Sequence, residues 1–333
     1  MRNYILRRLL ILIPIMLGVS FLTFAMFRMI PGDAAVLRCQ LGCTPEVLED
    51  LRHEMGLDRP WYIQYRDWVW DITKPVVHHI GPVPIPGPRF DLGHSLTESR
   101  LPVTTELDRR LPITGELLVV TMIMALLLGI PPGVISAIRP GTPLDWLARV
   151  GSVLWLSIPS FWLGILVIAF GVSWFNWTPP QFGRGYVPFL DDPWVNLQQF
   201  FFPSLVLALA IAAAIMRLTR SSLLEVLGND YIRTAWSKGL RERTVVMRHA
   251  LKNALIPVLT IVGLQVGALI GGSVIIESVF NLNGVGKYVL EAILRRDFFV
   301  VQSVVLLFAV AFVTANLVVD ILYGWLDPRI RYG

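Results

Sequence analysis

Six long stretches of the chain contain no Asp, Glu, Lys or Arg, and this pattern constrains the fold more than any other feature. The shortest of them has 19 residues. They cover 9–27, 117–138, 150–183, 193–216, 253–276 and 298–319. A helix needs about 20 apolar residues to cross the hydrocarbon core of a bilayer. We therefore predict an all-α integral membrane protein whose six spanning helices lie at 9–30, 113–138, 147–175, 200–220, 254–276 and 299–323.

The composition supports a membrane location. Charged residues are 16% of the 333 residues, against about 25% in soluble domains. Low charge combined with high hydrophobicity excludes a disordered chain, and two cysteines are too few for a disulfide scaffold. A net charge of +5 could suit nucleic acid, but cytoplasmic loops of membrane proteins collect Lys and Arg. The predicted partner is therefore the lipid bilayer, with no nucleic acid.

The distribution of Lys and Arg sets the orientation. With the N-terminus inside, the inside segments carry 15 Lys and Arg and the short outside loops carry four. Both termini are then cytoplasmic. The first apolar segment could instead be a cleaved signal peptide, but its apolar run is longer than usual and lacks a clear cleavage site. We favour an uncleaved first helix.

The segment 31–112 is predicted to be external and soluble in character. Thr44 can cap a helix that starts at Pro45 and ends at Gly56. A second helix is expected from Pro60, followed by a Pro-rich loop over 73–90. The segment either packs as a cap on the spanning helices or forms a docking surface for a protein that delivers substrate.

Two pairs of residues in this segment are candidates, one for a disulfide and one for a metal site. Cys39 and Cys43 can form a disulfide in an external location or stay free and packed, and we favour the disulfide. His78 and His79 have no Cys or acidic partner at ligand spacing, so no metal site is predicted.

The cytoplasmic loop 217–253 is the most informative segment. Asn229 or Asp230 can cap a helix over 231–238, and Gly239 can end it in the left-handed conformation. An isolated helix of two turns is marginal in water, so this helix must dock. Helical geometry places Ile232 and Trp236 on one face, and on another face it places Tyr231, Thr234, Ala235 and Lys238. The helix can then lie between its own membrane domain and a partner, or lie on anionic lipid.

The fifth span carries a stripe of glycines, with a G-x-x-x-G pattern at 267–271. Such a stripe lets another helix approach closely. Dimerisation and a packing contact within the chain both explain it.

Several motifs resemble one family. They include Y-I-R-T-A-W-S-K-G-L at 231–240 and R-H-A-L-K-N-A-L-I-P at 248–257. Others are P-G-D at 31–33, D-L-G-H-S-L at 91–96, I-P-S-F-W-L-G at 158–164, F-N-L-N-G-V-G at 280–286 and L-D-P-R-I-R-Y-G at 326–333. In this order they resemble the permeases of ATP-binding-cassette importers, specifically the peptide and nickel branch, over essentially the whole chain 1–333.

The resemblance implies a transport subunit of a prokaryotic inner membrane, with no catalytic residues of its own. An external substrate-binding protein delivers the solute, a second homologous permease completes the pathway, and two ATPase subunits bind ATP and Mg. The chain lacks a G-x-x-x-x-G-K-[S/T] sequence, so it holds no P-loop. The residues expected to couple to the ATPase are Tyr231, Arg233, Thr234, Ala235, Lys238, Gly239 and Leu240.

The chain departs from the general importer signature. Arg233, Thr234 and Ala235 stand where that signature has E-A-A, which is similar to the peptide branch. Phe90 replaces the usual Gly before D-L-G, and 73–89 resembles an insertion.

The solute stays open among peptides, nickel chelates and oligosaccharides. Phe161, Trp162 and Gln265 are candidates for the pathway because they fall mid-span, although such residues more often pack within the bundle. The alternatives are an ion-coupled secondary carrier and a membrane-embedded enzyme. Both would require ionisable groups deep in the membrane. The spans offer few, and these lie near helix ends.

Overall fold

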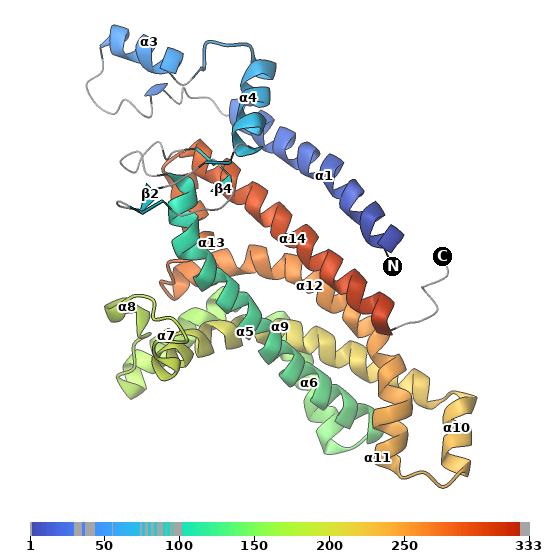
Figure 1. Ribbon diagram of the computed structural model, residues 1–333. Coiled ribbons are helices and arrows are strands. Elements are labelled where there is room, and N and C mark those ends of the chain that lie inside the picture. Colours follow the sequence, from blue (N-terminus) through green and yellow to red (C-terminus); the bar gives the residue numbers. More distant parts are fainter. Residues whose placement is uncertain are drawn as a thin grey trace. The chain divides into compact units, whose positions relative to one another are not determined.

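A computed structural model describes residues 2–29, 35–36, 44–54, 56–73, 75–76, 79–80, 83–84, 89–90, 92–93, 95 and 102–326 (Figure 1). Cys39, Cys43, His78 and the motifs at 31–33 and 327–333 lie outside these residues. The chain forms two compact units. One contains Ile113–Gly286 and Phe312–Gly333, and the other contains Arg2–Pro112 and Lys287–Ala311.

Helices make up nearly all of the described structure. Four are long and apolar enough to span a bilayer: α5 (Val103–Ile138), α9 (Pro193–Leu227), the continuous helix Glu242–Val279, and Phe298–Val319 within α14 (Phe298–Leu326). The first helix, α1 (Arg2–Met29), contains a shorter apolar stretch, Leu10–Met26. Two of the shorter helices are α8 (Gln181–Arg184) and α13 (Val285–Leu294).

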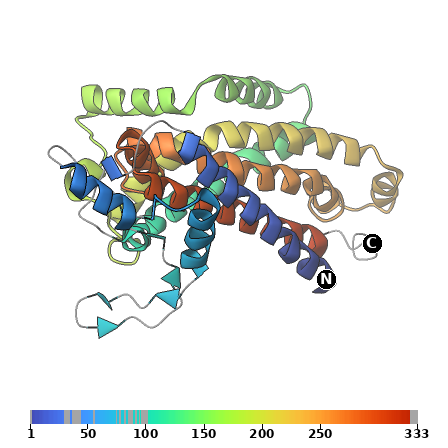
Figure 2. The ribbon, with the colours of Figure 1, turned by 90° about the horizontal axis from the view of Figure 1, so that it is seen from above.

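The third predicted span, 147–175, is not one straight helix. It is divided into α6 (Pro143–Ser157) and α7 (Ser160–Phe175), which are bent by 98° relative to each other. Ile158 is extended, at φ −91° and ψ 121°. The cause is Pro159, which disfavours helical geometry in the residue before it and has no N–H to donate. Figure 2 shows both helices beside α9.

The segment 31–112 contains the two predicted helices. In α3 (Pro45–Glu54) the Val47 amide donates to the Thr44 hydroxyl, and Gly56 ends the helix at φ +63°. In α4 (Trp61–Thr73) the Tyr65 hydroxyl lies 2.9 Å from that of Ser20 on α1. Aromatic contacts of Tyr65 and Trp68 with Phe24 continue this packing. The helix α4 thus packs on α1, and the choice between a cap and a docking surface stays a prediction.

The stretch expected to be a loop, 73–90, contains four two-residue strands. β1 (Pro75–Val76) pairs antiparallel with β4 (Arg89–Phe90), and β2 (His79–Ile80) pairs antiparallel with β3 (Val83–Pro84). Proline is tolerated in such ladders because each strand is at an edge.

The central helix of the Ile113–Gly286 unit is α9. In its most apolar stretch of 18 residues, 67% of the residues are buried, against 22–28% in the corresponding stretches of the other three long helices. It packs against α5 at Gly129 and Gly133, where the two backbones are too close for any side chain on α5. A Cβ at these positions would lie 2.8 Å from the carbonyl oxygens of Ala212 and Met216, respectively. This pair, G-x-x-x-G at 129–133, was missed in the sequence.

The glycine stripe of the predicted fifth span lies in the helix Glu242–Val279 and packs within the chain. A Cβ at Gly263 would lie 2.8 Å from Val319 Cγ1, and one at Gly267 would overlap the ring of Phe312, both on α14. Gly271 has no atom within 4 Å of such a Cβ. The packing interpretation therefore accounts for two of these glycines.

A buried carboxylate near the end of the helix Glu242–Val279 connects this helix to α5 and to the loop that follows Val279. Glu277 is fully buried, and the Thr114 hydroxyl of α5 donates to its Oε1 at 2.7 Å. The same hydroxyl accepts a hydrogen bond from the Val285 amide at 2.8 Å. A Cβ at Gly284 would lie 2.6 Å from Glu277 Oε2, and one at Gly286 would lie 2.9 Å from it. The motif N-G-V-G thus lets the loop close over the carboxylate.

The loop between α8 and α9 is braced by side chains of α9. Gln199 accepts from the Val187 amide at 3.1 Å, and Asn196 donates to the Val187 carbonyl at 3.0 Å. The Tyr186 hydroxyl donates to Glu116 at 3.0 Å. Burial, with the neighbouring carboxylate, raises the pKa of Tyr186 to about 12. Tyr186 therefore stays a neutral donor at physiological pH.

The close contact of α5 with α9 makes a testable prediction. Gly133→Ala should destabilise the protein by about 1–3 kcal/mol, because the methyl group would overlap the Met216 carbonyl. Gly115→Ala is the matched control on the same helix, since nothing lies within 4 Å of its Cβ. The control should be neutral or gain up to about 1 kcal/mol. Thermal unfolding in detergent measures both, and equal midpoints would contradict the packing described.

Candidate coupling surface formed by α10

The short helix predicted after the fourth span is present as α10 (Asp230–Ser237), at the end of α9 (Figure 1). Asn229 is its N-cap in the extended conformation, without a side-chain capping bond. At the other end Gly239 has φ +73°, and its amide donates to the Trp236 carbonyl at 2.9 Å. The predicted left-handed Gly239 is confirmed, and the helix lies one residue earlier than expected.

The helix docks through two side chains. Ile232 is fully buried and Ala235 is 7% exposed. They pack into a cluster that we call the platform, which contains Val134, Ala137, Leu223, Val245, Val246, Ala250 and Ala254. A helix this short needs such support, because its own hydrogen bonds cannot hold it in water.

The face assignment made from the sequence is wrong. Ile232 was paired with Trp236, and Ala235 with Tyr231, but the structure buries Ile232 and Ala235 together and exposes the two aromatic residues. Residues three apart lie on the same side of a helix. Small size explains the choice of Ala235, because the platform is built from close-packed aliphatic side chains.

The segment after α10 reaches the fifth span without a break. It consists of α11 (Glu242–Thr244), the π-helix η1 (Val245–Ala250) and α12 (Leu251–Val279). Pro257, expected near the start of this span, lies inside α12. The Leu251 amide donates to the Val246 carbonyl, five residues back.

The π-turn explains why the platform residues face one way. Val246 and Ala250 are four apart, and Val245 and Ala250 are five apart, yet all three are buried in the platform. An α-helix would turn a residue five positions on away from the first, whereas the wider π-turn brings it round to the same side. A second contact fixes α10 from its exposed side, where Asn253 of α12 donates to the Tyr231 hydroxyl at 2.8 Å.

The outer face of α10 is apolar and basic. Tyr231 is 45% exposed, Trp236 44% and Leu240 36%. Of the predicted coupling residues, all except Ala235 are exposed, and they lie on or directly after this one helix. Met247, also exposed, and Trp236 were not among them. Exposed cations outnumber exposed acidic residues on α10 and in the segment that follows it. The cations are Arg233, Lys238, Arg241, Arg243, Arg248 and Lys252, and the acidic residues are Asp230 and Glu242.

The pathway candidates lie on α7 and α12, two helices that pack on each other. Phe161 and Trp162 are exposed at the start of α7, and Gln265 is half-buried in α12. Exposure of aromatic side chains on an apolar helix fits lipid, a partner subunit or a pathway equally. Their role stays a prediction.

Comparison with known proteins identifies the family. Residues 129–332 match the binding-protein-dependent transport system inner membrane component, and residues 1–118 match the N-terminal model of these membrane components. The chain belongs to this family. It is therefore a multi-pass permease of the inner membrane and the membrane component of an ATP-binding-cassette importer, not an enzyme. The resemblance seen in the sequence is confirmed.

Full-length relatives carry names of dipeptide transport. The permease is 39% identical to the dipeptide transport system permease protein DppB of Escherichia coli (strain K12), over 100% of this chain and 99% of that protein. It is 36% identical to DppB of Alkalihalophilus pseudofirmus, over 100% of both. Among solved structures, the inward-facing MetNI methionine ABC transporter is similar, with a TM-score of 0.53 at 18% identity. That match covers 66% of this chain and 96% of the other, and it concerns the fold alone.

The geometry at Gly239 makes a second prediction. Gly239→Val should loosen α10, because a β-branched residue in the left-handed conformation costs about 1–2 kcal/mol. No atom lies within 4 Å of the added Cβ, so the effect would come from the backbone alone. Hydrogen exchange of the 232–237 amides should become roughly tenfold faster.

The matched control is Gly239→Asn, because Asn adopts the left-handed conformation readily. Its exchange should stay near that of the original protein. Identical exchange in the Val and Asn variants would contradict the assigned role of the left-handed turn.

Proposed function

We propose that this permease imports peptides, forming half of the translocation pathway with a second homologous permease. Two ATPase subunits would drive it, and an external binding protein would deliver the solute. The observation that carries the solute class is the full-length similarity to DppB proteins at 36% and 39% identity. ATP and Mg would bind on the ATPase subunits, since this chain has no P-loop sequence.

The exposed face of α10 is the proposed contact with an ATPase subunit. Tyr231, Trp236 and Leu240 together present apolar area that a solvated linker would not require. Aromatic residues combined with Arg are typical of the central residues of protein interfaces. An occupant with an apolar groove and an acidic rim matches both the aromatic side chains and the surrounding cations.

A docked helix suits this role mechanically. Ile232 and Ala235 attach α10 to a platform made from α5, α9, η1 and α12. A force applied to the outer face would therefore act on the ends of three long helices at once. A flexible loop could not pass on such a displacement.

We also propose the topology with six spans and cytoplasmic termini. The first span would be α1, with its apolar stretch Leu10–Met26, and the third would be the bent pair α6 and α7. The excess of Lys and Arg in the segments on the α10 side supports this orientation. The segment 31–112 is then external and 217–253 cytoplasmic. Phe161, Trp162 and Gln265 remain candidates for the pathway.

The function can be tested with the permease co-purified with its partner subunits and reconstituted into liposomes. Dipeptide uptake should require ATP, Mg and the binding protein, and the permease alone should hydrolyse no ATP. Gly239→Val should lose uptake and retain less ATPase subunit, while Gly239→Asn keeps both. Uptake of an oligosaccharide but not of a dipeptide would contradict the proposed solute class. ATP hydrolysis by the single chain would refute the permease role.

The orientation can be tested in intact cells. After mild reduction, a thiol reagent that cannot cross the membrane should label Cys39 or Cys43. A Thr234→Cys variant in which both native cysteines are serine should be labelled only in broken cells, because Thr234 is exposed on α10. Labelling with the opposite pattern would reverse the topology.

A further inference from the structure

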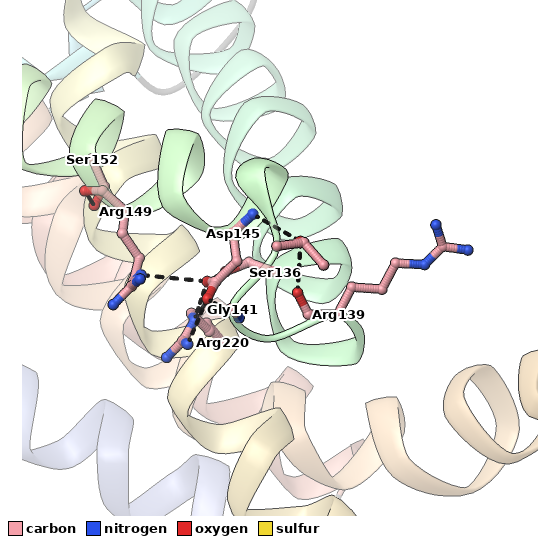
Figure 3. A network of polar contacts seen from close by, with 8 residues as sticks. Ser136, Arg139, Gly141, Asp145, Arg149, Ser152 and Arg220 are labelled. Atoms are coloured by element: carbon pink, nitrogen blue, oxygen red, sulfur yellow. Dashed lines mark hydrogen bonds and ion pairs between the residues drawn. The ribbon is translucent and has the colours of Figure 1, made fainter.

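A buried acidic residue lies close to the platform of α10. Asp145 of α6 is 1% exposed. Its carboxylate accepts hydrogen bonds from the Ser136 hydroxyl and from the Gly141 amide, the latter at 2.9 Å. Arg220 of α9 donates to both carboxylate oxygens, from Nε at 2.8 Å and from a terminal nitrogen at 3.2 Å (Figure 3). We call this group the clamp.

The clamp joins three helices by polar contacts. Ser136 belongs to the last turns of α5, Gly141 to the turn that follows, and Asp145 to the first turn of α6. Arg220 comes from α9 and also donates to the Ser136 hydroxyl at 2.9 Å. Two-point contact of a planar guanidinium with a carboxylate fixes both distance and orientation.

The start of α6 is itself built around Asp145. Thr142 caps the helix by accepting from the Asp145 amide, and Pro143 occupies the first position. A carboxylate in the first turn also interacts favourably with the helix dipole. The clamp therefore fixes where α6 begins and in which direction it leaves α5.

The clamp shares its backbone with the platform. Ser136 lies between the platform residues Val134 and Ala137, and Arg220 lies one turn before Leu223 on α9. A displacement of the platform must then displace Ser136 and Arg220. If Arg220 moved away, the buried Asp145 carboxylate would lose its shortest ion pair and its two-point contact, which is unfavourable for a buried charge.

We propose that the clamp is a positioning device that passes movement of the α10 platform to α6, and through the bend at Ile158 to α7. The proposal rests on the proposed import function. It predicts that weakening the clamp separates ATP hydrolysis from transport, because α10 would still engage the ATPase while the α6–α7 pair no longer follows.

Arg149 offers a matched control. It also approaches the Asp145 carboxylate, but at 3.5 Å, and half of its side chain (51%) is exposed. Because the Arg149 side chain is half exposed and its contact is longer, solvent screens its charge more than that of Arg220, and it contributes less. Removing this second arginine therefore changes the local charge by the same amount as removing Arg220, without breaking the link to α9.

The test uses the reconstituted importer with Asp145→Asn, Arg220→Gln, Arg220→Lys and Arg149→Gln. Subunit assembly, ATP hydrolysis and dipeptide uptake are measured for each. For the first three variants we expect assembly and hydrolysis within about twofold of the original, and at least tenfold less uptake per ATP. Arg149→Gln should keep the original ratio of uptake to hydrolysis.

An unchanged ratio in the assembled Asp145 and Arg220 variants would overturn the proposal. So would loss of assembly in all three, because the clamp would then serve stability alone. If only Asp145→Asn fails to assemble, the ratio of uptake to hydrolysis in Arg220→Lys tests the proposal, since this variant keeps the charge and loses the two-point contact. Failure of uptake by the original complex would instead refute the import function, which separates the two outcomes.

Discussion

The close approach of α5 to α9 is the contact on which the rest of the Ile113–Gly286 unit depends. Gly129 and Gly133 let the two backbones meet without intervening side chains. In a bilayer the lipid tails are as apolar as the side chains, so apolar burial does not drive helices together. Close backbone packing and polar contacts supply the association, and α9 also contacts α6, α7 and α12.

The same constraint explains which parts of the fold could be predicted from sequence. Charge-free runs identify helices because a spanning segment must satisfy its backbone internally. The caps at Thr44 and Gly239 follow from local backbone chemistry, and both are present. Such features depend on a few neighbouring residues and on no distant partner.

The features that were missed depend on tertiary partners. The bend at Ile158 was signalled by Pro159, but the uninterrupted apolar run concealed it. The glycines at 263–271 form a regular stripe typical of helix packing, whereas Gly129 and Gly133 are separated by Ile-Pro-Pro, which is not typical of a helical packing face. The π-turn at 245–250 leaves no local sequence signal, and it decides which side of α10 is buried because it positions the platform.

Two buried carboxylates define the ends of α5 within this unit. Thr114 donates to Glu277 near one end, and Ser136 donates to Asp145 near the other. The 22 residues between the two hydroxyls span about 33 Å at 1.5 Å per residue, close to the roughly 30 Å of a hydrocarbon core. A separation of this size would suit carboxylates near the two boundaries of a hydrocarbon core, where a charge costs less than at the midplane. Each carboxylate also fixes the loop or turn beside it, since Thr114 accepts from the Val285 amide and Asp145 accepts from the Gly141 amide. Between these levels α5 meets α9 through glycines, so its position is set at both ends and in the middle. An ion-coupled carrier would instead place an acidic group near the midplane, where its protonation could follow the transport cycle.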